Sequence, residues 1–278
     1  MVVSRETLAG LRVALPRLKS DDAIAAALKT AGAQVDTFAL TQTIPIESEQ
    51  LEQMRQRLAS GYYAWVVLSS WRAAQAVLAQ LNTLALAPTS APAPHSPTSA
   101  PTRLAAVGQS TAEWVNSHCA LKPTLVGAGS AAKLLEVFPT PPTATTAAAS
   151  TAATPTICLP QSQLAAPTLA QGLSQLGWQV DAVATYTTVP LPQLPTHLKT
   201  QWQAGAWDAV VVTAGSSTQA LLQLLGPPPK KTAVVSIGKS TTARCRELGL
   251  RVDATAATPR AEHITQAIIN LFKAKDFS

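Results

Sequence analysis

The chain has 278 residues, of which 47% are hydrophobic and only 13% charged, and its formal net charge is +6. This length predicts two domains, and the hydrophobic fraction is sufficient for a buried core in each. No apolar run approaches the roughly 20 residues that span a bilayer, and Met1–Arg12 lacks the apolar segment of a secretory signal. We therefore expect a cytoplasmic protein without membrane contact.

The basic residues are spread along the chain, and Lys230–Lys231 is the only adjacent pair. A nucleic-acid-binding face would need a basic stripe or cluster, so the pattern favours a small polyanionic ligand over nucleic acid. Cys119, Cys158 and Cys245 lie far apart without C-x-x-C spacing. This spacing argues against a zinc site, the count excludes a disulfide framework, and we predict small buried side chains.

Three segments each resemble a segment further along the chain, and together these pairs indicate an internal duplication. The second pair keeps one offset along its length, and the offset of the last pair is smaller by about the length of one insertion. The pairs are RVALPRLKSDDAIAAALKTAGAQVD (Arg12–Asp36) with TICLPQSQLAAPTLAQGLSQLGWQVD (Thr156–Asp181), YAWVVLSSWRAAQAVLAQL from Tyr63 with WDAVVVTAGSSTQALLQLL from Trp207, and LAAVGQSTAEWV from Leu104 with VVSIGKSTTARC from Val234.

Within each copy, short apolar strands alternate with helices. The strands are continuous apolar runs, which suit a parallel sheet buried on both faces. The helices carry apolar residues at spacings of three and four and end at glycine. We predict an α/β fold with two similar, doubly wound, flavodoxin-like parallel-sheet domains. The residues that show these patterns are Trp65–Leu68, Val210–Val212 and Ala233–Ile237 for strands, Ala74, Val77, Leu78, Leu81, Leu221, Leu222 and Leu225 for helices, and Gly32, Gly177 and Gly249 for helix ends.

Two low-complexity segments interrupt this pattern, Ala87–Thr102 and Pro139–Pro155. Both consist mainly of Pro, Ala, Thr and Ser, and neither holds an acidic or basic side chain apart from His95. Such a composition cannot bury enough apolar surface to order itself, so we predict flexible surface insertions.

Gly, Ser and Thr are concentrated where the predicted strands end and the next helices begin. In open α/β sheets, ligands bind beyond the carboxyl ends of the strands, beside helix N-termini that attract anions. The junctions therefore predict a cleft for a molecule with several carboxylates, although for each junction alone simple helix capping is the commoner explanation. The junction residues are Ser69, Ser70, Gly108–Thr111, Gly129, Ser130, Thr213–Ser217 and Gly238–Thr242.

The sequence contains no recognisable catalytic constellation. Its four histidines, His95, His118, His197 and His263, are isolated from one another. GKST at Gly238–Thr241 ends like a nucleotide-binding loop but lacks the upstream glycine, which excludes a nucleotide site there. An enzyme of this composition would act mainly by holding a reactive substrate in one shape.

A set of motifs occurs in a fixed order along the chain: AGAQVDTFAL, WVVLSS, AAVGQSTAEWV, GWQVDAVATYTTVP, DAVVVTAGSSTQAL and VVSIGKSTTARCRELGLRVDATAATPRAEHI. Together they resemble the uroporphyrinogen-III synthases over nearly the whole chain, apart from the two insertions. Each motif alone is weak. The order is specific, notably VG-x-x-T-A with IG-x-x-T, and Tyr-x-Thr after the QVD strand.

This resemblance implies a lyase that cyclises hydroxymethylbilane to uroporphyrinogen III, with loss of water and inversion of ring D through a spirocyclic pyrrolenine. The pathway would be tetrapyrrole biosynthesis, which leads to haem, chlorophyll and sirohaem. The eight carboxylates of the substrate fit the basic chain and the hydroxyl-rich junctions. The implied protein is a monomer that needs no metal or cofactor and contacts hydroxymethylbilane synthase only transiently.

The family fold also implies a discontinuous domain of residues 1–38 and 187–278, and a second domain of residues 41–183. Crossing segments near Val35–Thr41 and Val180–Thr188 would form a two-segment hinge. A plain tandem duplication would instead divide the chain once, near Thr145–Pro155.

The functional tyrosine of the family matches Tyr186, whose hydroxyl would help the substrate hydroxyl to leave. The alternative is that Tyr186 only packs, with its hydroxyl in water. Pro16-Arg17 reverses the Arg-Pro of many relatives, and Ala214 replaces a serine whose hydroxyl is missing or comes from Ser216. The implied substrate-binding residues are Ser69, Ser70, Gly108, Ser110, Thr111, Thr213, Ser216, Gly238, Lys239, Ser240, Thr241 and Arg17.

Three other functions are weighed against this one. A two-domain small-anion binding or sensor protein would use the same cleft without chemistry, but it would normally carry a signal peptide. A glycosyltransferase would need a longer chain, acidic contacts to a nucleotide sugar and a Gly-rich phosphate loop. A non-catalytic interaction module is favoured if the junction hydroxyls are only buried caps.

Overall fold

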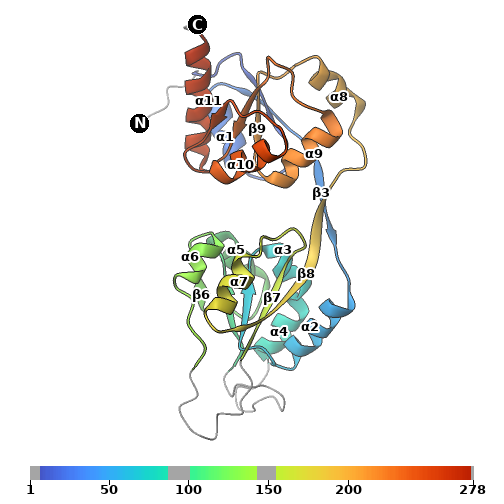
Figure 1. Ribbon diagram of the computed structural model, residues 1–278, viewed down its shortest axis with the longest axis vertical. Helices are drawn as coiled ribbons and strands as arrows, with labels where there is room; N and C mark the ends of the chain where they lie inside the picture. Colours follow the sequence, from blue (N-terminus) through green and yellow to red (C-terminus); the bar gives the residue numbers. More distant parts are fainter. Residues whose placement is uncertain (1–6, 87–100, 143–154, 277–278) are drawn as a thin grey trace, which may run out of the picture. The chain divides into compact units, whose positions relative to one another are not determined.

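The computed structural model describes residues 7–86, 101–142 and 155–276 (Figure 1). The chain divides into two compact units: unit 1 consists of Met1–Gln42 and Thr188–Ser278, and unit 2 of Thr43–Thr187. Most of both predicted insertions, including His95, lies outside the described residues. None of the helices that the structure describes combines the length and apolar character needed to cross a membrane.

The chain passes between the units in two strands, β3 (Thr41–Pro45) and β8 (Gln179–Pro190), which are neighbours in one sheet. The N–H of Leu191 donates to the carbonyl of Leu40 at 2.9 Å, and that of Ile46 donates to Thr185 at 3.0 Å, so the two strands run in opposite directions. The first crossing strand begins later than expected, because Gln34–Thr37 is strand β2 and pairs inside unit 1.

Unit 1 contains a five-stranded sheet in the order β11-β10-β9-β1-β2, and each neighbouring pair is parallel. The chain runs from β1 to β2 at one edge of the sheet, and later continues through β9, β10 and β11 on the other side of β1. This is the flavodoxin-like order, with a switch point between β1 and β9. The strands not yet given are β1 (Arg12–Leu15), β9 (Ala209–Val212), β10 (Ala233–Ser236) and β11 (Ala254–Thr255).

The helices of unit 1 cover both faces of this sheet, which explains why its strands are apolar without alternation. Val13 and Val211 face a core with α1 (Ala23–Thr30) and α11 (Ala261–Asp276). Val210 and its neighbours on the other face pack against the remaining helices. These helices are α8 (Thr196–Gln203), α9 (Gly215–Leu225) and α10 (Lys239–Glu247).

Unit 2 repeats this architecture with its strands in a different chain order. Its sheet is β3-β8-β7-β4-β5-β6, and all pairs from β8 to β6 are parallel. If β7 is taken as the first strand, the order is again flavodoxin-like, and the switch point lies between β7 and β4. Unit 2 is therefore a circular permutation of unit 1. The strands not yet given are β4 (Trp65–Leu68), β5 (Arg103–Ala106), β6 (Leu125–Val126) and β7 (Thr156–Ser162).

Two separate cores cover the faces of the sheet in unit 2. Val66 and Leu68 face α2 (Glu49–Ala59), α3 (Trp71–Ala76), α4 (Leu78–Leu86) and α5 (Gln109–His118). Val67 faces the opposite core with α6 (Ala131–Leu135) and α7 (Thr168–Gln175). All three cysteines are buried and free, as expected for small apolar side chains.

The helix predicted over Ala74–Leu81 is interrupted in the structure. It consists of α3 (Trp71–Ala76) and α4 (Leu78–Leu86), and Val77 between them has φ −123°. Spacings of three and four continue across this break, so the apolar pattern does not reveal it. The predicted helix ends at Gly32, Gly177 and Gly249 are confirmed, since each has a positive φ.

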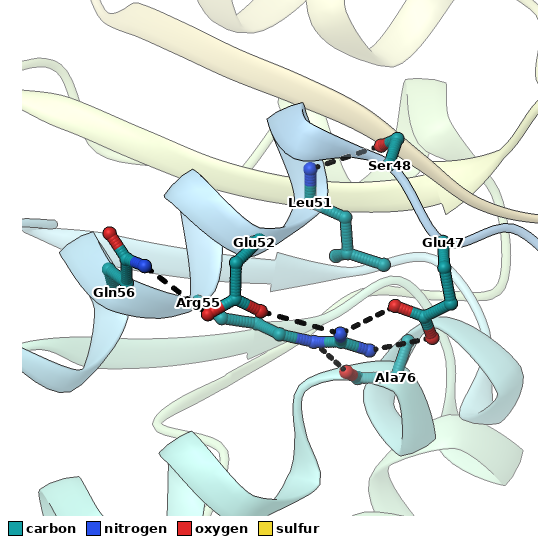
Figure 2. A network of polar contacts seen from close by, with 7 residues as sticks. All are labelled: Glu47, Ser48, Leu51, Glu52, Arg55, Gln56 and Ala76. Atoms are coloured by element: carbon teal, nitrogen blue, oxygen red, sulfur yellow. Dashed lines mark hydrogen bonds and ion pairs between the residues drawn. The ribbon is translucent and has the colours of Figure 1, made fainter.

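An arginine fixes the end of α3 where this break occurs (Figure 2). The Arg55 guanidinium donates its Nε–H to the carbonyl of Ala76 at 3.1 Å and binds both carboxylate oxygens of Glu47 at 2.6 and 3.1 Å. Its hydrogen bond with Glu47 raises the pKa of Arg55 and lowers the pKa of Glu47. The network ties α3 to α2 and to the segment that follows β3.

Candidate functional site

The switch point of each unit is the place where a doubly wound sheet opens a crevice for a ligand. In unit 1, Arg17 follows β1 and Thr213 follows β9. In unit 2, Ser69 and Ser70 follow β4, next to the end of β7. The predicted site residues therefore lie at the edge of each sheet where the fold provides for binding.

The structure brings two of the predicted residues of unit 2 together. The side-chain oxygen of Ser70 lies 3.0 Å from the phenolic oxygen of Tyr186 and also accepts the N–H of Ala73 as the N-cap of α3. Tyr186 lies near the carboxyl end of β8, opposite Ser162 of β7. Both residues are only half-buried. The hydroxyl of Tyr186 therefore has a partner within the protein.

The turn after β5 is held by a close contact between two glycines. Gly108 is the N-cap of α5, and a Cβ there would lie 2.9 Å from the Cα of Gly129. The N–H of Gly129 also donates to the carbonyl of Val107 at 2.9 Å. Thr111 is buried and Ser110 is exposed. Of these two hydroxyl residues, Ser110 is therefore the one that faces solvent.

In unit 1, the turn after β1 forms an ion pair within itself. Arg17 donates from Nε and Nη2 to the two carboxylate oxygens of Asp22, both at 2.6 Å. Asp22 is also the N-cap of α1 and accepts from the N–H groups of Ile24 and Ala25. Burial opposes its ionisation, but Arg17 and these N–H groups outweigh burial and lower the pKa of Asp22. Arg17 is therefore already engaged with a carboxylate of its own chain.

The turn after β9 has no side-chain cap. Ala214 is the N-cap of α9 without a side-chain hydrogen bond, so Ser216 does not supply the missing hydroxyl as a cap. Ser217 and Thr218 instead donate to the carbonyl of Ala214. Thr213 and Ser216 are half-buried.

The turn after β10 is open around its glycine. Gly238 is the N-cap of α10, and a Cβ there would meet no heavy atom within 4 Å. Lys239 and Ser240 are exposed, whereas Thr241 is buried. Below this turn, Thr242 bonds to Ser236 at 2.5 Å and to Thr255 at 2.8 Å, so these three hydroxyls hold the carboxyl ends of β10 and β11 together.

Three features of these turns were not predicted from the sequence: the capping role of Asp22, the hydroxyl cluster around Thr242, and the pair Trp71–Arg72 at the start of α3. Two of them had a signal in the sequence, because an aspartate directly before an apolar helical run is a typical N-cap and WR directly follows the Ser-Ser turn. The hydroxyl cluster depends on contacts between strands and a helix that the sequence pattern does not relate.

Several other titratable side chains are bound or buried within their own unit. The hydroxyl of Tyr63 donates to Asp181, which also binds Arg57 at 3.2 Å, and burial raises the pKa of Tyr63. Burial likewise raises the pKa of the Cys158 thiol. His118 is stacked on Trp114. Over residues 7–86, 101–142 and 155–276, no three His, Cys, Asp or Glu side chains gather as metal ligands would.

Two flavodoxin-like units whose strands end at turns rich in glycine, serine and threonine define a two-domain α/β protein. The family model for uroporphyrinogen-III synthase HemD matches residues 22–266. The chain belongs to the uroporphyrinogen-III synthase family, a family of cyclising enzymes of tetrapyrrole synthesis.

Solved structures agree with this fold. A mutant uroporphyrinogen III synthase from the extremely thermophilic bacterium Thermus thermophilus has a TM-score of 0.58 at 18% identity, with 95% of this chain and 100% of that chain covered. The uroporphyrinogen-III synthetase of Helicobacter pylori has a TM-score of 0.59 at 14% identity, with 94% and 99% covered. At such identities the likeness establishes the fold alone. No curated protein matches the sequence.

Proposed function

We propose that this protein is a uroporphyrinogen-III synthase, a lyase that cyclises hydroxymethylbilane to uroporphyrinogen III with loss of water and inversion of ring D. The observation that carries the proposal is the family match over residues 22–266. The net charge of +6 supports a substrate with eight carboxylates. The reaction serves the synthesis of haem, chlorophyll and sirohaem.

Tyr186 is the proposed catalytic residue. Its hydroxyl donates a hydrogen bond to the leaving hydroxyl of the substrate, which departs as water with the proton of the adjacent pyrrole nitrogen and leaves an azafulvene. Ring D then attacks this azafulvene through its substituted α-carbon and forms the spirocyclic pyrrolenine. The bond from that carbon to the methylene shared with ring C breaks, and the methylene bonds to the free α-carbon of ring D, which loses its proton. The macrocycle is thereby closed with ring D inverted. The contact of 3.0 Å with Ser70 supports this role, because it fixes the direction of the phenol while either oxygen is able to donate.

The substrate carboxylates are proposed to bind at the turns of the two units. Exposed Ser110, Lys239 and Ser240 and the half-buried Ser69, Thr213 and Ser216 supply side chains, and Gly108 and Gly238 supply backbone N–H groups. Buried Thr111 and Thr241 support the first turns of their helices. Arg17 would bind a carboxylate only by sharing its guanidinium with Asp22.

The two units are proposed to act as the two domains of a cytoplasmic monomer that works without metal or cofactor. The chain crossing twice between the units, in β3 and β8, supports a hinge at this position. Contact with hydroxymethylbilane synthase would be transient and would serve to pass on an unstable substrate.

A coupled isomer assay tests the function directly. Porphobilinogen and hydroxymethylbilane synthase generate the substrate, and chromatography separates the oxidised type I and type III products. Uncatalysed closure gives the type I isomer, so the expected result is a switch to type III when this protein is added. Type I product from a folded sample would contradict the proposal and favour a binding or sensor protein.

A further inference from the structure

An exposed tryptophan and an arginine directly follow the Ser70–Tyr186 pair. Trp71 and Arg72 are the first two residues of α3. Trp71 is 39% exposed, which is unusual for so large an apolar side chain. The guanidinium carbon of Arg72 lies 4.4 Å from the centroid of its ring, which is a cation–π contact.

Arg72 has no carboxylate partner within the described residues, and no other polar group there binds its guanidinium. Six other described arginines form an ion pair with a carboxylate: Arg12, Arg17, Arg55, Arg57, Arg244 and Arg251. Arg103 resembles Arg72, because it also lies over a tryptophan ring and has no ion pair within the described residues. A guanidinium that stacks on an aromatic face keeps its N–H groups available at its edge, where they bind carboxylates in pairs.

The tryptophan below this guanidinium is held in place by neighbouring rings. Trp114 of α5 lies 6.0 Å from Trp71 between centroids. Trp114 in turn stacks on His118 at 4.3 Å with an interplanar angle of 9°. At the other end of α3, Arg55 holds the carbonyl of Ala76 (Figure 2). Arg72 is therefore carried by a short helix whose first residue and last residue are both fixed.

We propose that Arg72 binds one carboxylate of the polycarboxylate substrate and that Trp71 is the positioning residue that orients its guanidinium. This inference rests on the proposed function. Its basis is the combination of an unpaired guanidinium, a supported aromatic face and a place in the chain directly after Ser70, whose hydroxyl contacts Tyr186.

Steady-state kinetics of the coupled reaction test the proposal in the full chain. Arg72→Ala should raise KM about five- to tenfold, as loss of a partly exposed charged hydrogen bond does, and leave kcat nearly unchanged, because the contact is the same in the ground and transition states. Arg72→Lys should recover part of this loss. Trp71→Leu should raise KM less than Arg72→Ala does, and Trp71→Phe should return KM to the wild-type value.

The same sheet offers a matched control at its opposite end. Arg103, the first residue of β5, lies 5.6 Å over the ring of Trp65, the first residue of β4. Arg103→Ala removes the same charge and the same kind of contact from the same unit, at the amino ends of the strands. Its KM should equal that of the wild type. An equal rise in KM for both alanine variants would overturn the proposal, because net charge alone would then explain it.

A binding measurement separates this inference from the proposed function. Uroporphyrin III, the stable oxidised product, is titrated into each variant, and its visible absorption band is followed. Affinity should fall about five- to tenfold in Arg72→Ala, as for KM, and remain unchanged in Arg103→Ala. Unchanged KM and unchanged affinity in Arg72→Ala, with an active wild type, would refute the role of Arg72 alone. A wild type that binds the porphyrin without forming type III product would refute the function alone.

Discussion

The turns at Gly108 in unit 2 and Gly238 in unit 1 have nearly the same sequence but different surroundings. Both glycines are N-caps, and the third residue of each following helix is a buried threonine. Gly108 is pressed against Gly129, whereas the space at the Cα of Gly238 is open. One glycine is required by packing, and the other leaves room for a ligand. The glycine of a repeated motif therefore need not have the same physical role in both copies.

The hydroxyls next to the switch points differ in the same way. In unit 2, Ser70 caps α3 and contacts Tyr186. In unit 1, the residue at the corresponding place is Ala214, and no side chain caps α9. The turn after β1 contains an ion pair, whereas Gln161, which corresponds to Arg17 in the duplicated segment, lies inside β7. The two units have thus kept the same backbone fold, but the polar side chains at corresponding positions differ.

The largest expected effect concerns the hydroxyl pair that only unit 2 possesses. Tyr186→Phe should lower kcat about a hundredfold, the lower end of what a positioned proton donor contributes. Ser70→Ala should lower it less, since the phenol keeps its proton but loses its orientation. The isomer assay measures both, and urea unfolding serves as the control for an intact fold. Unchanged turnover in Tyr186→Phe would remove this residue from the mechanism.

The second prediction separates the two glycines. Gly108→Ala should destabilise the protein by about 2 kcal/mol, since its Cβ would overlap the backbone of Gly129. Gly238→Ala should cost less than about 1 kcal/mol, because φ there is extended and the surroundings are open. Urea unfolding measures both free energies. Equal losses would show that the two turns do not differ as the structure indicates.

The third prediction addresses the ion pair of the turn after β1. Asp22→Asn keeps a capping oxygen and removes the charge that Arg17 binds, which should cost about 1–2 kcal/mol at neutral pH. The folded state lowers the pKa of Asp22, so its contribution is complete above the unfolded value of about 3.9 and is lost as the pH falls through the lower folded value. The stability difference between wild type and variant should therefore shrink below about pH 4. A difference that stays constant from about pH 7 to about pH 3 would speak against this pair.

The smallest expected effect is a gain in stability. Ala214 has the extended conformation of an N-cap without a capping side chain. Ala214→Ser should therefore stabilise the protein by about 0.5–1 kcal/mol, by accepting an N–H of the first turn of α9. Thermal unfolding measures this gain, with Ala214→Val as the control that adds volume without an acceptor. Equal melting temperatures for the serine and valine variants would show that capping is not limiting here.

The sequence was sufficient for much of the fold. Continuous apolar runs located the strands, as at Trp65–Leu68, and glycines located helix ends, because both follow from local chemistry. The break at Val77 was not predictable, since Arg55 stabilises the end of α3 from another helix. Of the site, the junction residues were named in advance. Which of these residues is a helix cap, a packing glycine or an exposed hydroxyl depends on contacts between strands. The sequence pattern contains no information on such contacts.

The circular permutation of the units has a consequence for how the chain folds during synthesis. The first strands of unit 1 leave the ribosome early, but β1 pairs with β9, which follows the whole of unit 2. The continuous unit is complete first and can fold while residues 1–42 still lack their partners. Closing unit 1 then requires contacts between residues far apart in sequence, which are slow to form. We therefore expect unit 2 to fold first and the closure of unit 1 to be the slower step.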